Sequence, residues 1–274
     1  MNNLFSLQDK VIVITGAAGL LGRQHAEAVA GAGGIPVLLD LHAAPVEAMA
    51  ADLKKRFTVA AGGWRVDITD EAAVAANCAA LLAQYGRIDG LVNNAANNPK
   101  VEDGAGKNFS RLENFPLDVW QGDLAVGLTG AFLCAKHYGS AIAQNPAGGS
   151  IVNISSDLGL IAPDQRLYRK PGVPADQQPV KPVTYSAVKA GLIGLTRYLA
   201  TYWADRNVRC NALCPGGIEN NQDAAFLREV CSRIPMERLA RADEYRGSLL
   251  FLLSAASSYV NGAVLAADGG RSAW

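Results

Sequence analysis

The sequence predicts an α/β fold, in which a doubly wound, mostly parallel sheet of seven strands carries helices on both faces within one domain. Three observations predict this class. Short apolar segments alternate with helical segments along the 274 residues. The apolar segments are nearly continuous, which is typical of parallel strands covered on both faces. The first of them leads into a glycine-rich turn and then a helix.

Each apolar segment has the length and the Val, Ile and Leu content of a buried strand. We expect strands at Lys10–Thr15, Ile35–Leu41, Gly63–Asp67, Ile88–Asn93, Ser150–Ser155, Val208–Cys214 and Ala263–Ala267. Helical spacing of apolar residues predicts helices at Leu21–Ala32, Val46–Phe57, Glu71–Tyr85, Leu117–Gln144, Tyr185–Arg206 and Tyr245–Ala256. Strand–helix alternation over this length implies right-handed βαβ units.

The composition excludes several classes of function. Lys and Arg number 25, as do Asp and Glu, so the net charge is zero, which argues against nucleic acid as a partner. No apolar stretch is long enough to span a membrane, and the start lacks a signal segment, so we expect a cytoplasmic protein. The five cysteines are scattered without a His or Cys cluster, so we expect no metal site.

Two segments break the strand–helix alternation, at residues 97–116 and 157–183. Loops of this length in a compact domain are usually functional or disordered. The second segment has Arg166, Arg169, Lys170 and Lys181 against Asp164 and Asp176. This cationic excess favours an anionic substrate group, although a solvated loop accounts for it equally well. Its composition predicts little apolar packing and mobility without ligand.

The glycine-rich turn predicts a pyrophosphate site at a helix N-terminus, because glycines let the backbone approach a phosphate. The alternative is a tight turn that binds nothing. The residues expected to hold the cofactor here are Gly16, Ala18, Gly19, Leu20, Leu21 and Gly22. Asp40 and Leu41 end the second strand, where an acidic residue accepts hydrogen bonds from the adenosine ribose and repels a 2′-phosphate. The expected cofactor is therefore NAD rather than NADP.

A tyrosine and a lysine begin the helix predicted from Tyr185. Tyr185 and Lys189 are separated by one helical turn, so their side chains project from one face. A nearby cation lowers the pKa of a phenol, and such a tyrosine is a competent general acid or base for an alcohol–ketone pair. Ser156, which follows the fifth strand, is placed to hydrogen-bond the same substrate oxygen.

Taken together, these features resemble the short-chain dehydrogenase/reductase family, which has the Rossmann fold. The resemblance implies that Tyr185 donates or accepts the proton, that Ser156 orients the substrate oxygen, and that Lys189 holds the nicotinamide ribose. It further implies that Asp67 and Ile68 contact the adenine. The same resemblance assigns Asn94, Ala95 and Ala96 to the cofactor wall and Pro215, Gly216 and Ile218 to the nicotinamide border.

Three departures from the family pattern stand out. Leu20 replaces a glycine of the turn, and Gly127 replaces an Asn that anchors a water of the proton relay. Ser156 and Tyr185 are also separated by an insertion within residues 157–183. Tyr168 lies nearer the usual distance from Ser156, but Gly172 stands where its lysine would be, so we reject Tyr168 as the acid. Arg166 and Tyr168 are instead candidates for substrate contact.

Within the family, Asp123–Gly130, Ile154–Tyr168 and Arg271–Trp274 resemble the flagellin-modification protein A-like oxidoreductases of sugar biosynthesis. We therefore expect an NAD-dependent enzyme that interconverts a secondary alcohol and a ketone on an anionic sugar or sugar derivative. The alternatives are a 3-oxoacyl-type reductase and a non-catalytic NAD-binding partner in a biosynthetic complex. The low charge content and an apolar stripe on the Tyr185 helix predict a homo-oligomer, a tetramer or a dimer.

Overall fold

The computed structural model describes residues 4–97 and 110–274. Seven parallel strands form a sheet in the order β3-β2-β1-β4-β5-β6-β7. The strands are β1 (Val11–Thr15), β2 (Ile35–Asp40), β3 (Gly62–Arg65), β4 (Gly90–Asn93), β5 (Gly149–Ile154), β6 (Val208–Pro215) and β7 (Val264–Ala267). All seven coincide with the segments predicted as strands, which confirms the fold class.

The helices also follow the prediction, with one addition. They are α1 (Leu20–Gly31), α2 (Ala43–Phe57), α3 (Glu71–Tyr85), α4 (Leu117–Leu124), α5 (Gly130–Cys134), α6 (Ser140–Ile142), α7 (Val183–Tyr202), α8 (Ala224–Cys231) and α9 (Arg246–Leu253). Helices α4, α5 and α6 continue one another through wider π-type turns at Ala125–Thr129 and Ala135–Gly139. Helix α8 was not predicted. Its signal is Asp223, whose carboxylate caps the amides of Ala225 and Phe226.

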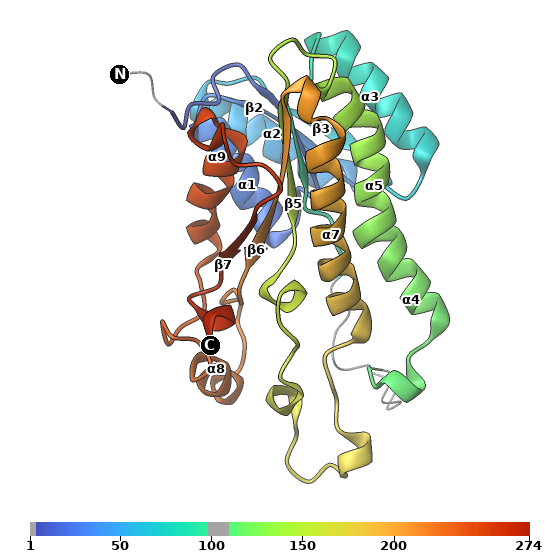
Figure 1. Ribbon diagram of the computed structural model, residues 1–274, viewed down its shortest axis with the longest axis vertical. Helices are drawn as coiled ribbons and strands as arrows, with labels where there is room; N and C mark the ends of the chain where they lie inside the picture. The colour runs from blue at the N-terminus through green and yellow to red at the C-terminus, as the bar shows by residue number, and fades with distance from the viewer. Residues whose placement is uncertain (1–3, 98–109) are drawn as a thin grey trace.

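The helices form two layers around the sheet (Figure 1). Helices α1, α2 and α9 cover one face, where Ile12, Ile14 and Leu38 of the sheet join their apolar residues in one cluster. The other face carries α3, α5 and α7 and is packed around Val13 and Leu39. Both faces of the strands are therefore buried, which explains their continuous apolar composition.

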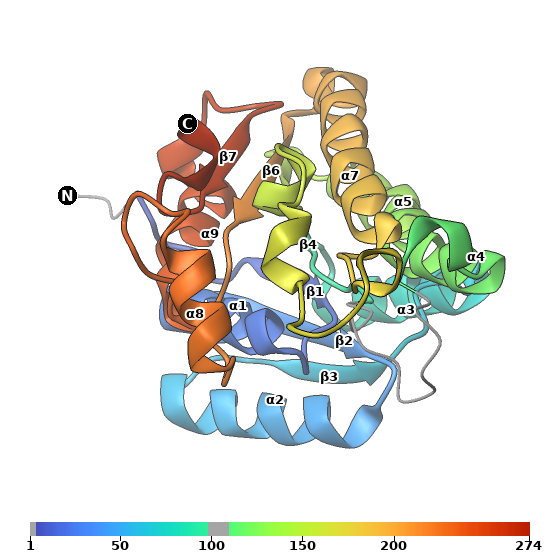
Figure 2. The ribbon, with the colours of Figure 1, turned by 90° about the horizontal axis from the view of Figure 1, so that it is seen from below.

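The strand order reverses between β1 and β4, because the chain continues outward from β1 to β2 and β3 before returning to β4. In open parallel sheets, ligands bind in the crevice at such a switch point, outside the carboxyl ends of the strands. The segment 157–183 and α8 lie at this same end of the sheet (Figures 1 and 2). Within the described residues, no helix has the length and hydropathy needed to cross a membrane.

A buried histidine on α1 makes the stability of this fold depend on pH. His25 is fully buried, neither of its ring nitrogens has a partner among the described residues, and burial lowers its pKa from 6.5 to about 4. The unfolded chain therefore binds more protons than the folded chain in this window, so stability falls as pH decreases from 6.5 toward 4. We expect a loss of about 2 kcal/mol between about pH 7 and about pH 5, measured by urea unfolding. His25→Leu should remove this part of the pH dependence.

Candidate active site

A cavity of about 430 Å³ occupies the crevice at the switch point. Most of the residues expected to bind the cofactor line it, namely Gly16, Gly19, Leu20, Leu21, Asp40, Leu41, Asp67, Ile68, Asn94, Ala95, Ala96, Tyr185, Lys189, Pro215, Gly216 and Ile218. Ala18 and Gly22 do not line it. The wall also contains residues that the sequence did not single out, namely Leu39, Val66, Asn97, Val126, Ile154 and Ser155. Three of these six, Val66, Ile154 and Ser155, end a strand or follow one directly, which is the signal that would have found them.

The glycine-rich turn is packed against its own backbone and against Ala95, which follows the neighbouring strand β4. Gly16 has a φ of 60° in the left-handed region, and a Cβ there would lie 2.8 Å from Ala95 Cα. A Cβ on Gly22 would lie 2.7 Å from Ala17 Cα. Gly19 precedes α1 without a side-chain cap, so the first amides of the helix remain available to a phosphate. The cavity and this turn therefore fit a dinucleotide.

The departure at Leu20 does not close the turn, because its side chain is 43% exposed and borders the cavity. Asn94 fixes the turn from the opposite side, where its Nδ2 donates to the carbonyl oxygens of Thr15 (2.9 Å) and Gly16 (3.0 Å). The Thr15 hydroxyl accepts the amide of Asn94 at 3.0 Å. These bonds tie the glycine-rich turn to the end of β4.

Asp40 has a structural contact as well as its predicted role toward the ribose. Its Oδ2 accepts the amide of Ala18 at 3.0 Å, which ties the end of β2 to the glycine turn. Arg23 donates from Nε to the Ala18 carbonyl at 3.0 Å. A second cation, Arg65, lies opposite Asp40 in the β2–β3 register and donates to the Leu41 carbonyl. Asp40 thus has arginines nearby on α1 and on β3.

The structure brings together the three residues expected to be catalytic. Tyr185 and Lys189 lie on α7, and the Lys189 Nζ is 5.8 Å from the centroid of the Tyr185 ring. The same Nζ donates to the carbonyl of Ile154 at 2.8 Å, which seats the buried lysine at the end of β5. Ser156 follows β5 and hydrogen-bonds Tyr185. A substrate oxygen between these hydroxyls meets both a proton donor and a second hydrogen-bonding partner.

The pKa of Tyr185 corrects one expectation. Burial raises this pKa above its ordinary value, the charge of Asp157 adds to the rise, and the hydrogen bond with Ser156 opposes it. The predicted lowering by Lys189 is not found, because the lysine is held on the Ile154 carbonyl and burial lowers its own pKa to about 8. In this state, Tyr185 is a phenol ready to donate a proton rather than a phenolate ready to accept one.

Val188 packs against Gly127, the position at which the family pattern has an Asn. A Cβ on Gly127 would overlap Val188 Cγ1, so the valine occupies the space of the missing side chain. Beside it lies a small cavity of about 10 Å³, which is bordered by Asp123, Thr184, Tyr185 and Lys189 among others. Asp123 accepts the hydroxyl of Thr184 at 2.6 Å. The cavity has the volume of about one water probe, so a single water is the most it can hold.

We expect Gly127→Asn to destabilise the protein rather than to restore the family pattern. The new side chain must displace the stiff, β-branched Val188, and overpacking of this kind costs about 1–3 kcal/mol. Urea unfolding measures the loss. The double variant Gly127→Asn/Val188→Ala should recover part of it, and a stable single variant would contradict the packing argument.

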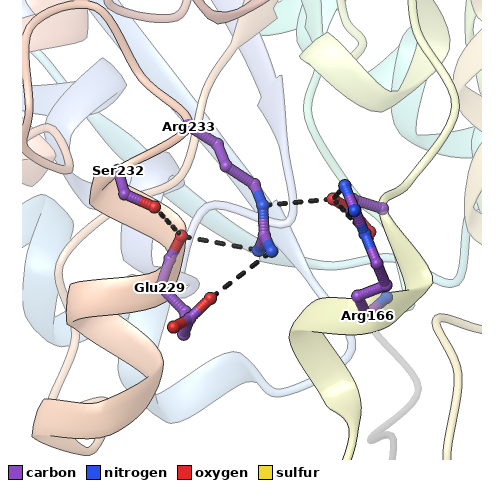
Figure 3. A network of polar contacts seen from close by, with 5 residues as sticks. Arg166, Glu229, Ser232 and Arg233 are labelled. Atoms are coloured by element: carbon purple, nitrogen blue, oxygen red, sulfur yellow. Dashed lines mark hydrogen bonds and ion pairs between the residues drawn. The ribbon is translucent and has the colours of Figure 1, made fainter.

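Segment 157–183 is bound to the region of α8 by charged side chains (Figure 3). Arg166 donates to both oxygens of Asp164, from Nε at 2.9 Å and from Nη2 at 2.7 Å. Arg233 reaches the same carboxylate at 3.1 Å and also pairs with Glu229 of α8. The hydrogen bond from Arg166, together with the charge of Arg233, holds the pKa of Asp164 well below its usual range. A substrate contact by Arg166 would therefore require it to exchange Asp164 for the substrate.

The same segment also contributes to an apolar cluster, which corrects the expectation that it packs little. Leu167 is buried at 8% exposure against Val230, Ile234 and Leu239. The Tyr168 ring lies 6.3 Å from that of Phe226, centroid to centroid. The sequence argument missed this cluster because α8, which supplies half of it, was not predicted. Segment 157–183 and α8 therefore form a common cover next to the residues expected to be catalytic.

Comparisons with known proteins agree with this geometry. A family model described as short chain dehydrogenase matches residues 10–168, and one described as Enoyl-(Acyl carrier protein) reductase matches residues 175–272. D-threitol dehydrogenase of Mycolicibacterium smegmatis is 33% identical, over 97% of this chain and 94% of its own length. Cis-4-hydroxycyclohexanecarboxylate dehydrogenase of Sinomonas cyclohexanicum is 34% identical, over 97% of each chain.

Among solved structures, a gluconate 5-dehydrogenase from Burkholderia cenocepacia J2315, in complex with NADP and tartrate, has a TM-score of 0.86. It is 28% identical and covers 99% of this chain and 98% of its own. The chain therefore belongs to the short-chain dehydrogenase/reductase family. It is an NAD(P)-dependent oxidoreductase that acts on alcohol and ketone groups.

Proposed function

We propose that the chain is an NAD-dependent oxidoreductase that interconverts a secondary alcohol and a ketone on a hydroxylated substrate bearing a carboxylate or another anionic group. The anionic group of the substrate is inferred from the position of Lys181. Its ammonium lies over the ring of Tyr185, 4.0 Å from the centroid, so a cation stands beside the reacting position. Burial lowers the pKa of this lysine to about 8, while the charge of Asp157 acts to raise it.

The relatives are consistent with such a substrate but include neutral ones. Two of them are named for carboxylates, gluconate and a hydroxycyclohexanecarboxylate, whereas a third is named for the polyol D-threitol. Lys181 distinguishes between these classes here, because a partly buried cation beside the reacting position favours an anionic group over a hydroxyl. We therefore place the substrate among the hydroxy acids and sugar acids rather than the polyols.

The chain's own residues perform the proton chemistry in this proposal. Bound NAD supplies the hydride acceptor, or in reduced form the donor. Ser156 orients the substrate oxygen, and Tyr185 gives its phenol proton to that oxygen in reduction or takes it in oxidation. Lys189, seated on the Ile154 carbonyl, places its ammonium toward the nicotinamide ribose and Tyr185. The cover formed by segment 157–183 and α8 excludes water from the reacting atoms.

A matched set of substrates tests the proposal. Aldonates and hydroxycyclohexanecarboxylates are compared with the polyols and cyclic alcohols of the same skeleton, with a 3-oxoacyl thioester included as the alternative. We expect higher kcat/KM for the acids, and Lys181→Met should raise their KM roughly tenfold or more, a loss of about 1.5–3 kcal/mol. Lys170→Met, an exposed lysine of the same segment, is the control. Equal rates for acids and neutral alcohols would contradict the proposal.

The preference for NAD rests on Asp40. Solved relatives carry NADP or NAD, so the family alone does not decide the cofactor. We expect wild-type kcat/KM to favour NAD. Asp40→Asn should reduce that preference by about 1.5–3 kcal/mol, because it removes the charge that repels a 2′-phosphate. Asparagine still accepts the Ala18 amide, so the turn is kept. Arg65→Ala is the second variant in which kcat/KM for NAD and NADP is compared. Equal use of both cofactors by wild type would contradict the assignment.

Two finer proposals depend on sequence patterns and surface composition. The similarity to the flagellin-modification protein A-like group is supported by the stretches given above. A homo-oligomer, tetramer or dimer, is supported by the exposed side chains of Phe132 on α5 and of Tyr198 and Tyr202 on α7. Light scattering at micromolar concentration checks the oligomer.

A further inference from the structure

A turn after β7 brings the end of the chain back to the active site. Asp268 follows β7, and its two carboxylate oxygens accept the amides of Gly270 and Ser272, each at 2.9 Å. Gly269 and Gly270 have φ values of 67° and 88°, which a residue with a side chain rarely adopts. The turn therefore fixes where the next residue, Arg271, starts.

Arg271 forms a buried ion pair with Asp157, the residue directly after the catalytic serine. The Arg271 Nη1 lies 2.8 Å from Asp157 Oδ2, and the two side chains are only 10% and 4% exposed. The two residues are separated by 114 positions in the chain. A buried pair of this kind costs desolvation energy, so its presence next to a catalytic residue suggests a role other than stability.

The second oxygen of Asp157 binds the catalytic serine. The Ser156 hydroxyl donates to Asp157 Oδ1 at 2.8 Å, and the amide of Leu158 donates to the same oxygen at 2.8 Å. The Ser156 side chain also hydrogen-bonds Tyr185, and this contact acts to lower the pKa of the tyrosine. A chain of contacts thus runs from Arg271 through Asp157 and Ser156 to Tyr185.

We propose that Arg271 and Asp157 are a positioning pair, which fixes the orientation of the Ser156 hydroxyl and balances the charge beside Tyr185. The inference rests on the proposed function in one respect, the roles given to Ser156 and Tyr185. Neither member of the pair needs to touch the substrate. Together they supply an acceptor for the serine proton without leaving a net negative charge at the tyrosine.

The charge balance is the part that can be measured. The Asp157 carboxylate raises the pKa of Tyr185, and Arg271 is the cation bound to that carboxylate. Without Arg271, the charge of Asp157 would act on Tyr185 with no bound cation to balance it. Lys181 cannot replace Arg271 there, because the pKa of Lys181 is about 8, below the raised pKa of Tyr185.

The other groups around Tyr185 come from several elements. They are Lys181 before α7, Lys189 on α7, Tyr168 in segment 157–183, Cys214 on β6 and Asp123 on α4. All of these stay unchanged in the variants below. A shift in the Tyr185 titration is therefore assigned to the pair.

The test is a pH titration of the protein labelled with [¹³Cζ]tyrosine, followed by NMR without substrate. Tyr185→Phe identifies the Tyr185 signal by removing it. We expect Arg271→Met to raise the titration midpoint of Tyr185 by about one pH unit or more, and Asp157→Asn to lower it. The double variant Arg271→Met/Asp157→Asn should return it close to the wild-type value.

Arg209→Met is the matched control, since Arg209 is a half-buried arginine whose partners within residues 4–97 and 110–274 are neutral groups of Ser254, Ser257 and Val260. It should lower the melting temperature without moving the Tyr185 midpoint. An unmoved midpoint in folded Arg271→Met overturns the proposal. If that variant does not fold, Asp157→Asn and the double variant decide, and an unmoved midpoint in Asp157→Asn overturns it.

A kinetic measurement separates this inference from the proposed function. Where wild type oxidises a substrate of the panel, the pH at which kcat/KM rises should shift upward in Arg271→Met and downward in Asp157→Asn. A midpoint that shifts by NMR in a protein that turns over no alcohol would support the pair and contradict the proposed function. Turnover that persists with an unmoved midpoint would do the reverse.

Discussion

Tyr185→Phe is expected to lower kcat/KM by roughly 10²–10⁴-fold, because the variant loses the proton donor and keeps every apolar contact of the ring. Cofactor affinity should change little, since the lost hydroxyl faces Ser156 and the substrate oxygen rather than the glycine turn. Steady-state kinetics and a cofactor titration by fluorescence measure the two effects separately.

Tyr168→Phe is the matched control for this experiment. Tyr168 lies close enough to Tyr185 and Arg271 for its pKa to respond to both, and burial raises that pKa to about 12. It lacks a lysine one turn later and packs against Phe226. Its loss should cost less than tenfold in kcat/KM. A Tyr185→Phe enzyme that retains most of its activity would remove Tyr185 from the role of acid and base.

Gly22→Ala is expected to disrupt both cofactor binding and folding. The new Cβ would overlap the Gly16 carbonyl and lie 2.7 Å from Ala17 Cα, and backbone atoms cannot move aside as a side chain does. Relief requires the glycine turn to open, which costs about 1–3 kcal/mol of stability and displaces the amides that would face a pyrophosphate. Urea unfolding and cofactor titration are the measurements.

Gly194→Ala, on another helix, is the control and is expected to have the opposite effect on stability. A Cβ on Gly194 of α7 would meet nothing within 4 Å, so the change should stabilise the protein by up to about 1 kcal/mol. Equal effects of the two substitutions would show that the glycine turn tolerates a side chain and would contradict the close packing described above.

The sequence was sufficient for features that depend on local pattern. The glycine turn, Asp40 and the Tyr185–Lys189 spacing each sit where a strand or helix begins or ends, and a parallel sheet brings such ends to one edge. The strand ranges could also be predicted, because an apolar run is a local pattern. A single-turn spacing also sufficed to place Lys189 near Tyr185.

Features that depend on distant contacts or on burial were not accessible in this way. The Arg271–Asp157 pair joins residues 114 positions apart through a glycine turn. The direction of the Tyr185 pKa shift depends on desolvation and on the contact of Lys189 with the Ile154 carbonyl, and neither follows from spacing. The prediction that segment 157–183 packs little was wrong, because the apolar partners of Leu167 lie on and around α8, a helix that was not predicted.

The central claim is that this chain moves a hydride between a carbinol carbon and a nicotinamide cofactor while Tyr185 moves the proton. The most direct measurement uses a sugar acid or hydroxy acid from the panel, deuterated at the carbinol carbon, with NAD. Mass spectrometry of the reduced cofactor should find the deuterium in it after incubation with wild type, and not after the same incubation with Tyr185→Phe. Reduced cofactor without deuterium, or equal labelling by both proteins, would contradict the account.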